Sequence, residues 1–109
     1  MAALDNRPLS EIFREAGESW AEKEFAAQLL EDTKSAVMAQ RQTELGDIPV
    51  NRAEQIVKAS PEWVEHIEKI AVARREANMA KINMEVVRMK YGEWNSREAN
   101  VRQELKMTA

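Results

Sequence analysis

The longest regular pattern of hydrophobic positions lies in the second half of the chain. With Trp63 as heptad position a, the a positions are Trp63, Ile70, Ala77, Met84, Tyr91, Glu98 and Leu105, and the d positions are His66, Ala73, Ala80, Val87, Trp94 and Val101. Only His66 and Glu98 interrupt the apolar stripe. A 3.5-residue period kept up this long is typical of a coiled-coil-forming helix. Ser60 and Pro61 are suited to the N-cap and the first helical position, so we predict one helix over 60–107, a rod of roughly 70 Å.

A weaker helical pattern precedes it, over residues 10–45. Its apolar residues recur at spacings of three, four and seven: Phe13, Ala16, Trp20, Ala27, Leu30 and Val37. Ser10 is the expected N-cap, and Gly46 ends the helix as the glycine that follows a C-cap. Residues 46–51 then form the predicted turn, and 52–59 a short helix capped by Asn51. Residues 1–9 show no period and are expected to be a loose tail.

The two long helices complement each other when they are folded back antiparallel. If residue 45 − k faces residue 60 + k, Ala27 and Leu30 meet the small residues of the later helix, which are Ala73, Ala77 and Ala80. Large side chains then face small ones, and residues 99–109 overhang. We therefore predict a single all-α domain, 1–109, built as an antiparallel helical hairpin with a long coiled-coil-like C-terminal helix and a short connecting helix.

Charge is unevenly distributed along the 109 residues. Residues 1–66 carry 7 Lys and Arg against 13 Asp and Glu, and residues 67–109 carry 9 against 6. The two halves should therefore attract each other when they lie side by side. The chain contains no cysteine, no secretion signal is visible and no apolar run reaches 18 residues. These features predict a cytoplasmic protein without disulfides or a membrane span.

A second apolar row lies on the later helix, at heptad positions c and f. Its members are Met79, Ile82, Val86 and Met89. A two-helix hairpin cannot cover both this row and the a/d stripe, and an exposed apolar row usually marks an interface. Three possibilities remain for what covers this row: another part of the same chain, a second copy of the chain, or a different protein. We predict a homodimer and a protein partner.

Basic residues form a column at the e positions of the same helix: Arg74, Lys81, Arg88 and Arg102. Successive members two turns apart could follow a phosphate backbone. They could equally pair with the acids of the first helix, which include Glu15, Glu22, Glu24, Glu31 and Asp32. Nucleic acid is therefore the alternative partner.

The remaining candidates are aromatic and titratable. Tyr91 and Trp94 are either core residues or a binding hot spot. His66 is the only histidine, and a helical metal site needs several such ligands, so no metal is expected. No nucleophile sits next to a base, and there is no glycine-rich phosphate loop. We therefore expect neither an enzyme nor a cofactor.

Two stretches resemble the C-terminal half of small uncharacterised helical proteins of phages and prophages. They are Ala73–Lys81, with Glu85, Arg88 and Met89 after it, and Trp94–Asn100 with its short basic tail. The resemblance implies a phage accessory protein concerned with DNA recombination or with countering host defences, in the host cytoplasm. From the residues themselves we expect an adaptor or inhibitor that binds another protein through a rigid helical surface. The alternatives are a nucleic-acid accessory protein and a structural or scaffold component.

Overall fold

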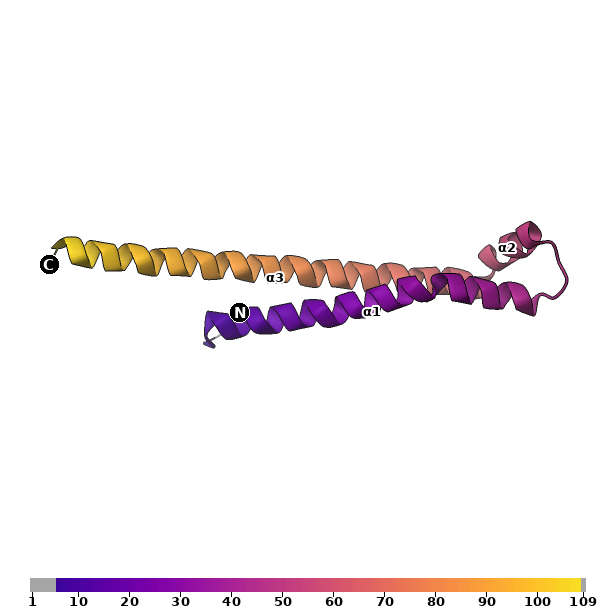
Figure 1. Cartoon of the computed structure of the whole chain (residues 1–109), viewed down its shortest axis with the longest axis horizontal. Helices are drawn as coiled ribbons and strands as arrows, with labels where there is room; N and C mark the ends of the chain where they lie inside the picture. Colours follow the sequence, from indigo (N-terminus) through magenta and orange to yellow (C-terminus); the bar gives the residue numbers. More distant parts are fainter. Residues whose placement is uncertain (1–5, 109) are drawn as a thin grey trace.

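The chain folds as an elongated hairpin of two long helices with a short helix at its closed end (Figure 1). The computed structural model describes residues 6–108, without the side chain of Thr108. Its helices are α1 (Leu9–Glu44), α2 (Val50–Lys58) and α3 (Pro61–Thr108). α1 packs mainly on α3, and the two run antiparallel. The predicted all-α hairpin is confirmed.

The molecule is a rod rather than a globule. Its extents are 86 × 29 × 16 Å, and its radius of gyration is 23.8 Å. A compact domain of this length would have a radius of gyration of about 13 Å. Since nothing in the hairpin is more than two helices deep along most of its length, most side chains keep one side in water. None of the described helices is both long and apolar enough to cross a membrane.

Both early helices begin at a proline instead of at the predicted polar caps. Pro8 and Pro49 occupy the N-cap positions with extended ψ angles of 141° and 139°, and no side chain caps either helix. The Pro8 carbonyl accepts from the amides of Glu11 and Ile12, so the backbone alone starts α1. The predictions of Ser10 and Asn51 as caps are therefore wrong. Leu9 is already helical, and residues 1–5 of the predicted loose tail lie outside the described residues.

The predicted glycine at the end of α1 and the predicted serine cap at the start of α3 are both present. Gly46 follows the C-cap residue Leu45 and has φ +80°, the left-handed conformation that favours glycine. The Ser60 hydroxyl oxygen accepts a hydrogen bond from the Trp63 amide at 3.3 Å, as expected of an N-cap. The same hydroxyl donates to the Val57 carbonyl at 2.6 Å and so joins the end of α2 to the start of α3.

The buried residues fall into two groups. Along the α1–α3 seam they are small, namely Ala16, Ala27, Ala77 and Ala80. At the closed end Trp63 is buried together with Ala53 and Val57 of α2. The alanines let the two helix backbones approach closely, which is why the seam holds without large buried side chains.

α3 extends well beyond the start of α1 (Figure 1). Every residue from 92 to 107 is exposed. Pro8 and Leu9 line a hollow together with Tyr91 and Trp94, whereas the predicted pairing would have placed Leu9 opposite Ser96. The overhang therefore begins several residues earlier than the predicted 99. We refer to residues 92–108 as the overhang.

Candidate interaction surfaces

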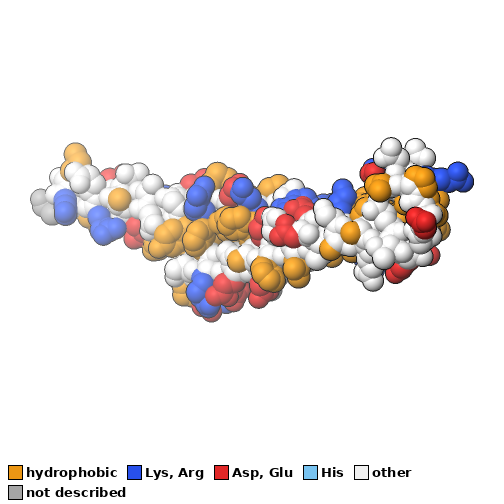
Figure 2. Space-filling model, turned by 45° about the vertical axis from the view of Figure 1, so that its right-hand side comes forward, with side chains coloured by type: hydrophobic (Ala, Val, Ile, Leu, Met, Phe, Trp, Pro, Cys, Tyr) orange, Lys and Arg blue, Asp and Glu red, His pale blue; other side chains and the backbone are white. Residues whose placement is uncertain are grey.

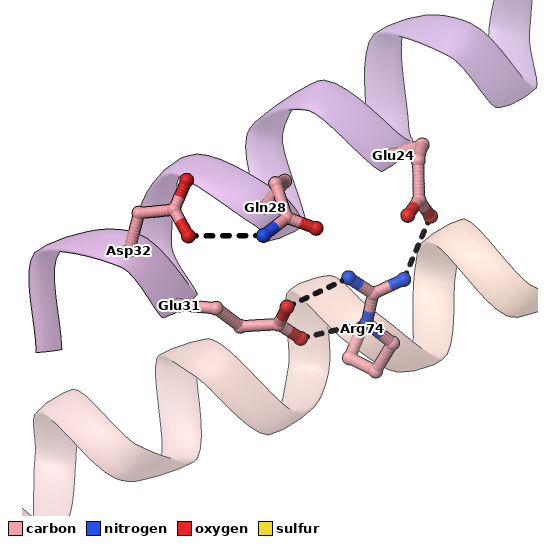
Figure 3. Close-up of polar contacts among 5 residues, drawn as sticks. All are labelled: Glu24, Gln28, Glu31, Asp32 and Arg74. Carbon is pink, nitrogen blue, oxygen red and sulfur yellow. Dashed lines mark hydrogen bonds and ion pairs between the residues drawn. The ribbon is translucent and has the colours of Figure 1, made fainter.

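Arg74, the first member of the predicted basic column, is held between two acids of α1 (Figure 3). Its Nε and Nη2 donate to the two carboxylate oxygens of Glu31 at 2.7 and 2.9 Å, and its Nη1 donates to Glu24 at 2.7 Å. Glu24 and Glu31 are seven residues apart, so they lie on one face of α1. The hydrogen bond from Arg74 lowers the pKa of Glu31 below its ordinary value, and the two glutamates raise the pKa of Arg74. Arg74 therefore joins the two helices rather than presenting a charge to phosphate.

The other members of the basic column differ in their surroundings. Lys81 places its Nζ 5.8 Å from the ring centroid of Trp20, a cation–π arrangement that again joins α3 to α1. Arg88 and Arg102 are exposed, and the Arg102 Nε makes one long hydrogen bond of 3.4 Å to the Glu98 carbonyl. On the face drawn in Figure 2, basic and acidic side chains are interspersed. The column is thus not a uniform basic track.

The predicted second apolar row is exposed along its whole length. The exposed fractions are 58% for Met79, 54% for Ile82, 37% for Val86 and 59% for Met89. At about 100° per residue, these four lie within about 40° of one line along α3, roughly opposite the seam that contacts α1. Arg75 and Glu93 stand on the same line, before and after the four. We call residues 75, 79, 82, 86, 89 and 93 the back row.

The overhang carries a second apolar surface, on the other side of α3. Trp94, Val101 and Leu105 are exposed by 49%, 51% and 63%. These are the d, d and a positions that continue the seam covered by α1 lower down. Tyr91 is half-buried beside Leu9, and Trp94 stands at the edge of the hollow where α1 begins. We call Trp94, Glu98, Val101 and Leu105 the overhang seam.

Sequence reasoning named Trp94 as a possible hot spot but did not recognise that Glu98, Val101 and Leu105 continue the same surface. The signal was available, because the predicted helix of 48 residues is longer than its predicted partner of 36. Where the longer helix continues past the end of the shorter one, its seam residues are either exposed to solvent or covered by another molecule. Tyr91 is half-buried and Trp94 is exposed, so the prediction of a binding hot spot at these residues stays a prediction.

His66 lies in the seam close to the closed end. Its ring centroid is 5.9 Å from that of Trp63. Its Nε2 is buried and has no hydrogen-bond partner within residues 6–108. In that same range, no group of three or more His, Cys, Asp or Glu is placed to hold a metal ion. The histidine is therefore a seam residue packed against an aromatic ring.

Comparisons with known proteins add no relative to this picture. A scan against protein-family models found no match, and searches of curated proteins and of solved structures found none. The resemblance to phage proteins therefore stays a prediction.

Proposed function

We propose that this chain is a non-enzymatic protein-interaction module whose overhang seam binds an amphipathic helix of another protein. The observation that carries the proposal is the continuation of the α1–α3 seam, with Trp94, Val101 and Leu105 half-exposed or more and no element of the described chain over them. A partner helix would extend the packing already present between α1 and α3. It would act at the open end of a rigid hairpin, as an adaptor or inhibitor surface.

The overhang seam has the composition of a helix-docking site. Helix-in-groove recognition uses apolar anchors spaced by three, four and seven residues, and 94, 101 and 105 are spaced by seven and four. Trp94 is the expected anchor, because tryptophan is enriched among the residues that dominate binding energy. The hollow between Trp94, Pro8 and Leu9 gives a partner side chain a place to pack.

Glu98 indicates what the partner must offer. It stands between Trp94 and Val101 in the seam, where a partner helix would remove its carboxylate from water. A buried carboxylate is costly unless it is paired, so the partner should carry Lys or Arg opposite it. The same residue disfavours two overhangs pairing with each other, since both carboxylates would then enter one seam.

The charge of the overhang favours a protein over nucleic acid as its partner. Residues 92–109 carry 3 Lys and Arg against 3 Asp and Glu, so this stretch has no net charge. Phosphate binding depends on a surplus of basic residues. Of the four residues of the basic column, Arg74 and Lys81 already contact α1. A nucleic-acid accessory role is therefore the weaker proposal.

The test is affinity capture from a lysate of the source cells, with and without nuclease, using three immobilised chains. They are the natural chain, Val101→Asp and the control Phe25→Asp. Phe25 is 71% exposed on α1, so the control adds the same charge at an exposed apolar site away from the overhang. We expect one stoichiometric protein to be captured by the natural chain and by Phe25→Asp, with at least a tenfold loss for Val101→Asp.

Other outcomes contradict the proposal in distinguishable ways. Recovery that nuclease abolishes, and that falls steeply with salt, would favour the nucleic-acid role. Capture of copies of this chain alone would favour a structural role. A captured protein that binds Val101→Asp as well as the natural chain would remove the overhang seam from consideration.

A further inference from the structure

We propose that two copies of this chain pair antiparallel through the back row of α3, with residue i of one copy opposite residue 168 − i of the other. The back row carries four successive exposed apolar side chains on the face of α3 roughly opposite the seam with α1. A second copy that runs antiparallel covers it completely, because the apolar and charged positions of the row then match the same row in the other copy.

The register follows from the positions of the apolar side chains. In an antiparallel helix pair, a-type positions of one helix pack against d-type positions of the other. With 168 as the sum, Met79 of one copy faces Met89 of the other, and Ile82 faces Val86. The two-fold axis passes at the level of residue 84, so each contact occurs twice. Four consecutive layers are then apolar on both sides.

Charged residues at both ends of the row agree with the same register. Arg75 of one copy faces Glu93 of the other, twice, because 75 and 93 also sum to 168. Within the described part of the chain, neither Arg75 nor Glu93 has an ion-pair partner of its own. Along one edge of the row, Glu76 and Lys90 of different copies also come together. Within residues 75–93 these four ion pairs outnumber the one adverse contact, between the two Glu85 side chains near the two-fold axis. Beyond the row, the same register brings Lys69 to Arg97 and Glu62 to Glu104, so the favourable charges are confined to the row itself.

Other registers fail on the same residues. An antiparallel shift of one heptad in one direction places Ile82 against Glu93, and in the other direction Arg75 against Val86. A parallel pair would place Arg75 against Arg75 and Glu93 against Glu93, and like charges destabilise an interface. The chain therefore specifies one orientation and one register, as charges flanking an apolar row do in coiled coils.

The dimer leaves the overhang seam open. The back row and the a/d seam lie on roughly opposite sides of α3, at about 100° per residue. Pairing through the back row therefore covers neither α1 nor Trp94, Val101 and Leu105. The self-association does not rest on the proposed function, and each can fail without the other.

The first experiment measures mass by sedimentation equilibrium, because an 86 Å rod migrates anomalously on sizing columns. The natural chain should have twice the monomer mass of 12.5 kDa at tens of micromolar. Ile82→Asp should weaken the dimer about 100-fold or more, because it buries two unpaired carboxylates beside the two-fold axis. Val101→Asp is the matched control and should remain a dimer. A monomeric natural chain at these concentrations would overturn the proposal.

A charge exchange tests the register without changing the apolar row. Arg75→Glu alone sets glutamate against Glu93 twice and should weaken the dimer about tenfold. Adding Glu93→Arg to it should restore the natural affinity. In a parallel dimer the single change would replace one like-charge contact by another, and the second change would rescue nothing. An equal affinity for all three chains would exclude this register.

Cysteine cross-linking gives a second test, because the natural chain has no cysteine. Chains carrying Arg75→Cys or Glu93→Cys should each fail to form disulfide-linked dimers, since equivalent residues lie 18 positions apart across the two-fold axis, about 27 Å. A mixture of the two variants should oxidise to a linked heterodimer. Linked homodimers of either variant would show a parallel pair and contradict the proposal.

Discussion

At the scale of single residues, the hairpin is held by small side chains rather than large ones. Ala27 of α1 and Ala77 of α3 are both 0% exposed, and no larger side chain of the described residues is as deeply buried. Each methyl group is enclosed completely in the seam between the two helices. Their role depends on their size, because a methyl group fills the space between the two helices at these positions.

Neighbouring alanines on α1 provide a direct test of that role. Ala27→Leu adds three carbon atoms inside the seam and should lower the free energy of unfolding by about 1–3 kcal/mol through overpacking. Ala26→Leu makes the same change at an exposed position and should stay within about 0.5 kcal/mol of the natural chain. Urea unfolding followed by circular dichroism measures both. Equal effects at the two positions would mean that the seam does not depend on the small residue.

At the scale of the elements, two glycines with different backbone conformations have opposite roles. Gly46 has φ +80° at the end of α1, whereas Gly92 lies inside α3, and an added Cβ meets nothing within 4 Å at either position. The same substitution therefore probes backbone conformation alone.

We expect the change to alanine to have opposite signs at these positions. Gly46→Ala should destabilise the hairpin by roughly 1 kcal/mol, because alanine pays a steric penalty in the left-handed region. Gly92→Ala should stabilise α3 by up to about 1 kcal/mol, because glycine is a poor helix former. Thermal unfolding compares the two variants with the natural chain. A loss of stability in Gly92→Ala would show that the glycine is needed for a close contact at the overhang.

The lengths of the elements, their antiparallel pairing and the start of α3 at Ser60 and Pro61 could be predicted from the sequence, whereas the caps of α1 and α2 could not. Periodicity over 60–107 and the complementarity of Ala27 and Leu30 with the alanines of α3 were sufficient for the hairpin. Arg74 and Glu31 meet in the predicted register, since 31 and 74 correspond to k = 14 in that pairing. The caps failed because Pro8 and Pro49 start their helices through backbone carbonyls, which side-chain capping rules do not detect.

The candidate surfaces were predictable to different degrees. The back row follows from heptad positions alone, because one short helix cannot cover a face this long. Whether Arg74 and Lys81 meet acids, aromatics or phosphate depends on rotamers and on the rotation of α1, so that choice stayed open until the structure showed it. The extent of the overhang seam depends on the residue of α3 that lies opposite the start of α1. That residue changes with each one-residue change in the register of the two helices.

At the scale of the whole molecule, the shape distinguishes between ways of pairing two copies. α3 is about 70 Å long at 1.5 Å per residue, and the turn with α2 supplies the remaining length of the 86 Å rod. Because the back row is centred near residue 84, close to the middle of α3, an antiparallel dimer adds little length. Pairing through the overhangs would instead join two rods end to end.

Small-angle X-ray scattering should therefore give a maximum dimension of about 100 Å for the back-row dimer, from the length of α3 with one closed end beyond each of its ends. Two overhangs paired in place of the back rows would give about 145 Å by the same rise per residue. Ile82→Asp should return the curve to that of a single rod of 86 Å. A dimer mass combined with the longer dimension would move self-association to the overhang seam, where the partner helix was placed, and both proposals would then fall together.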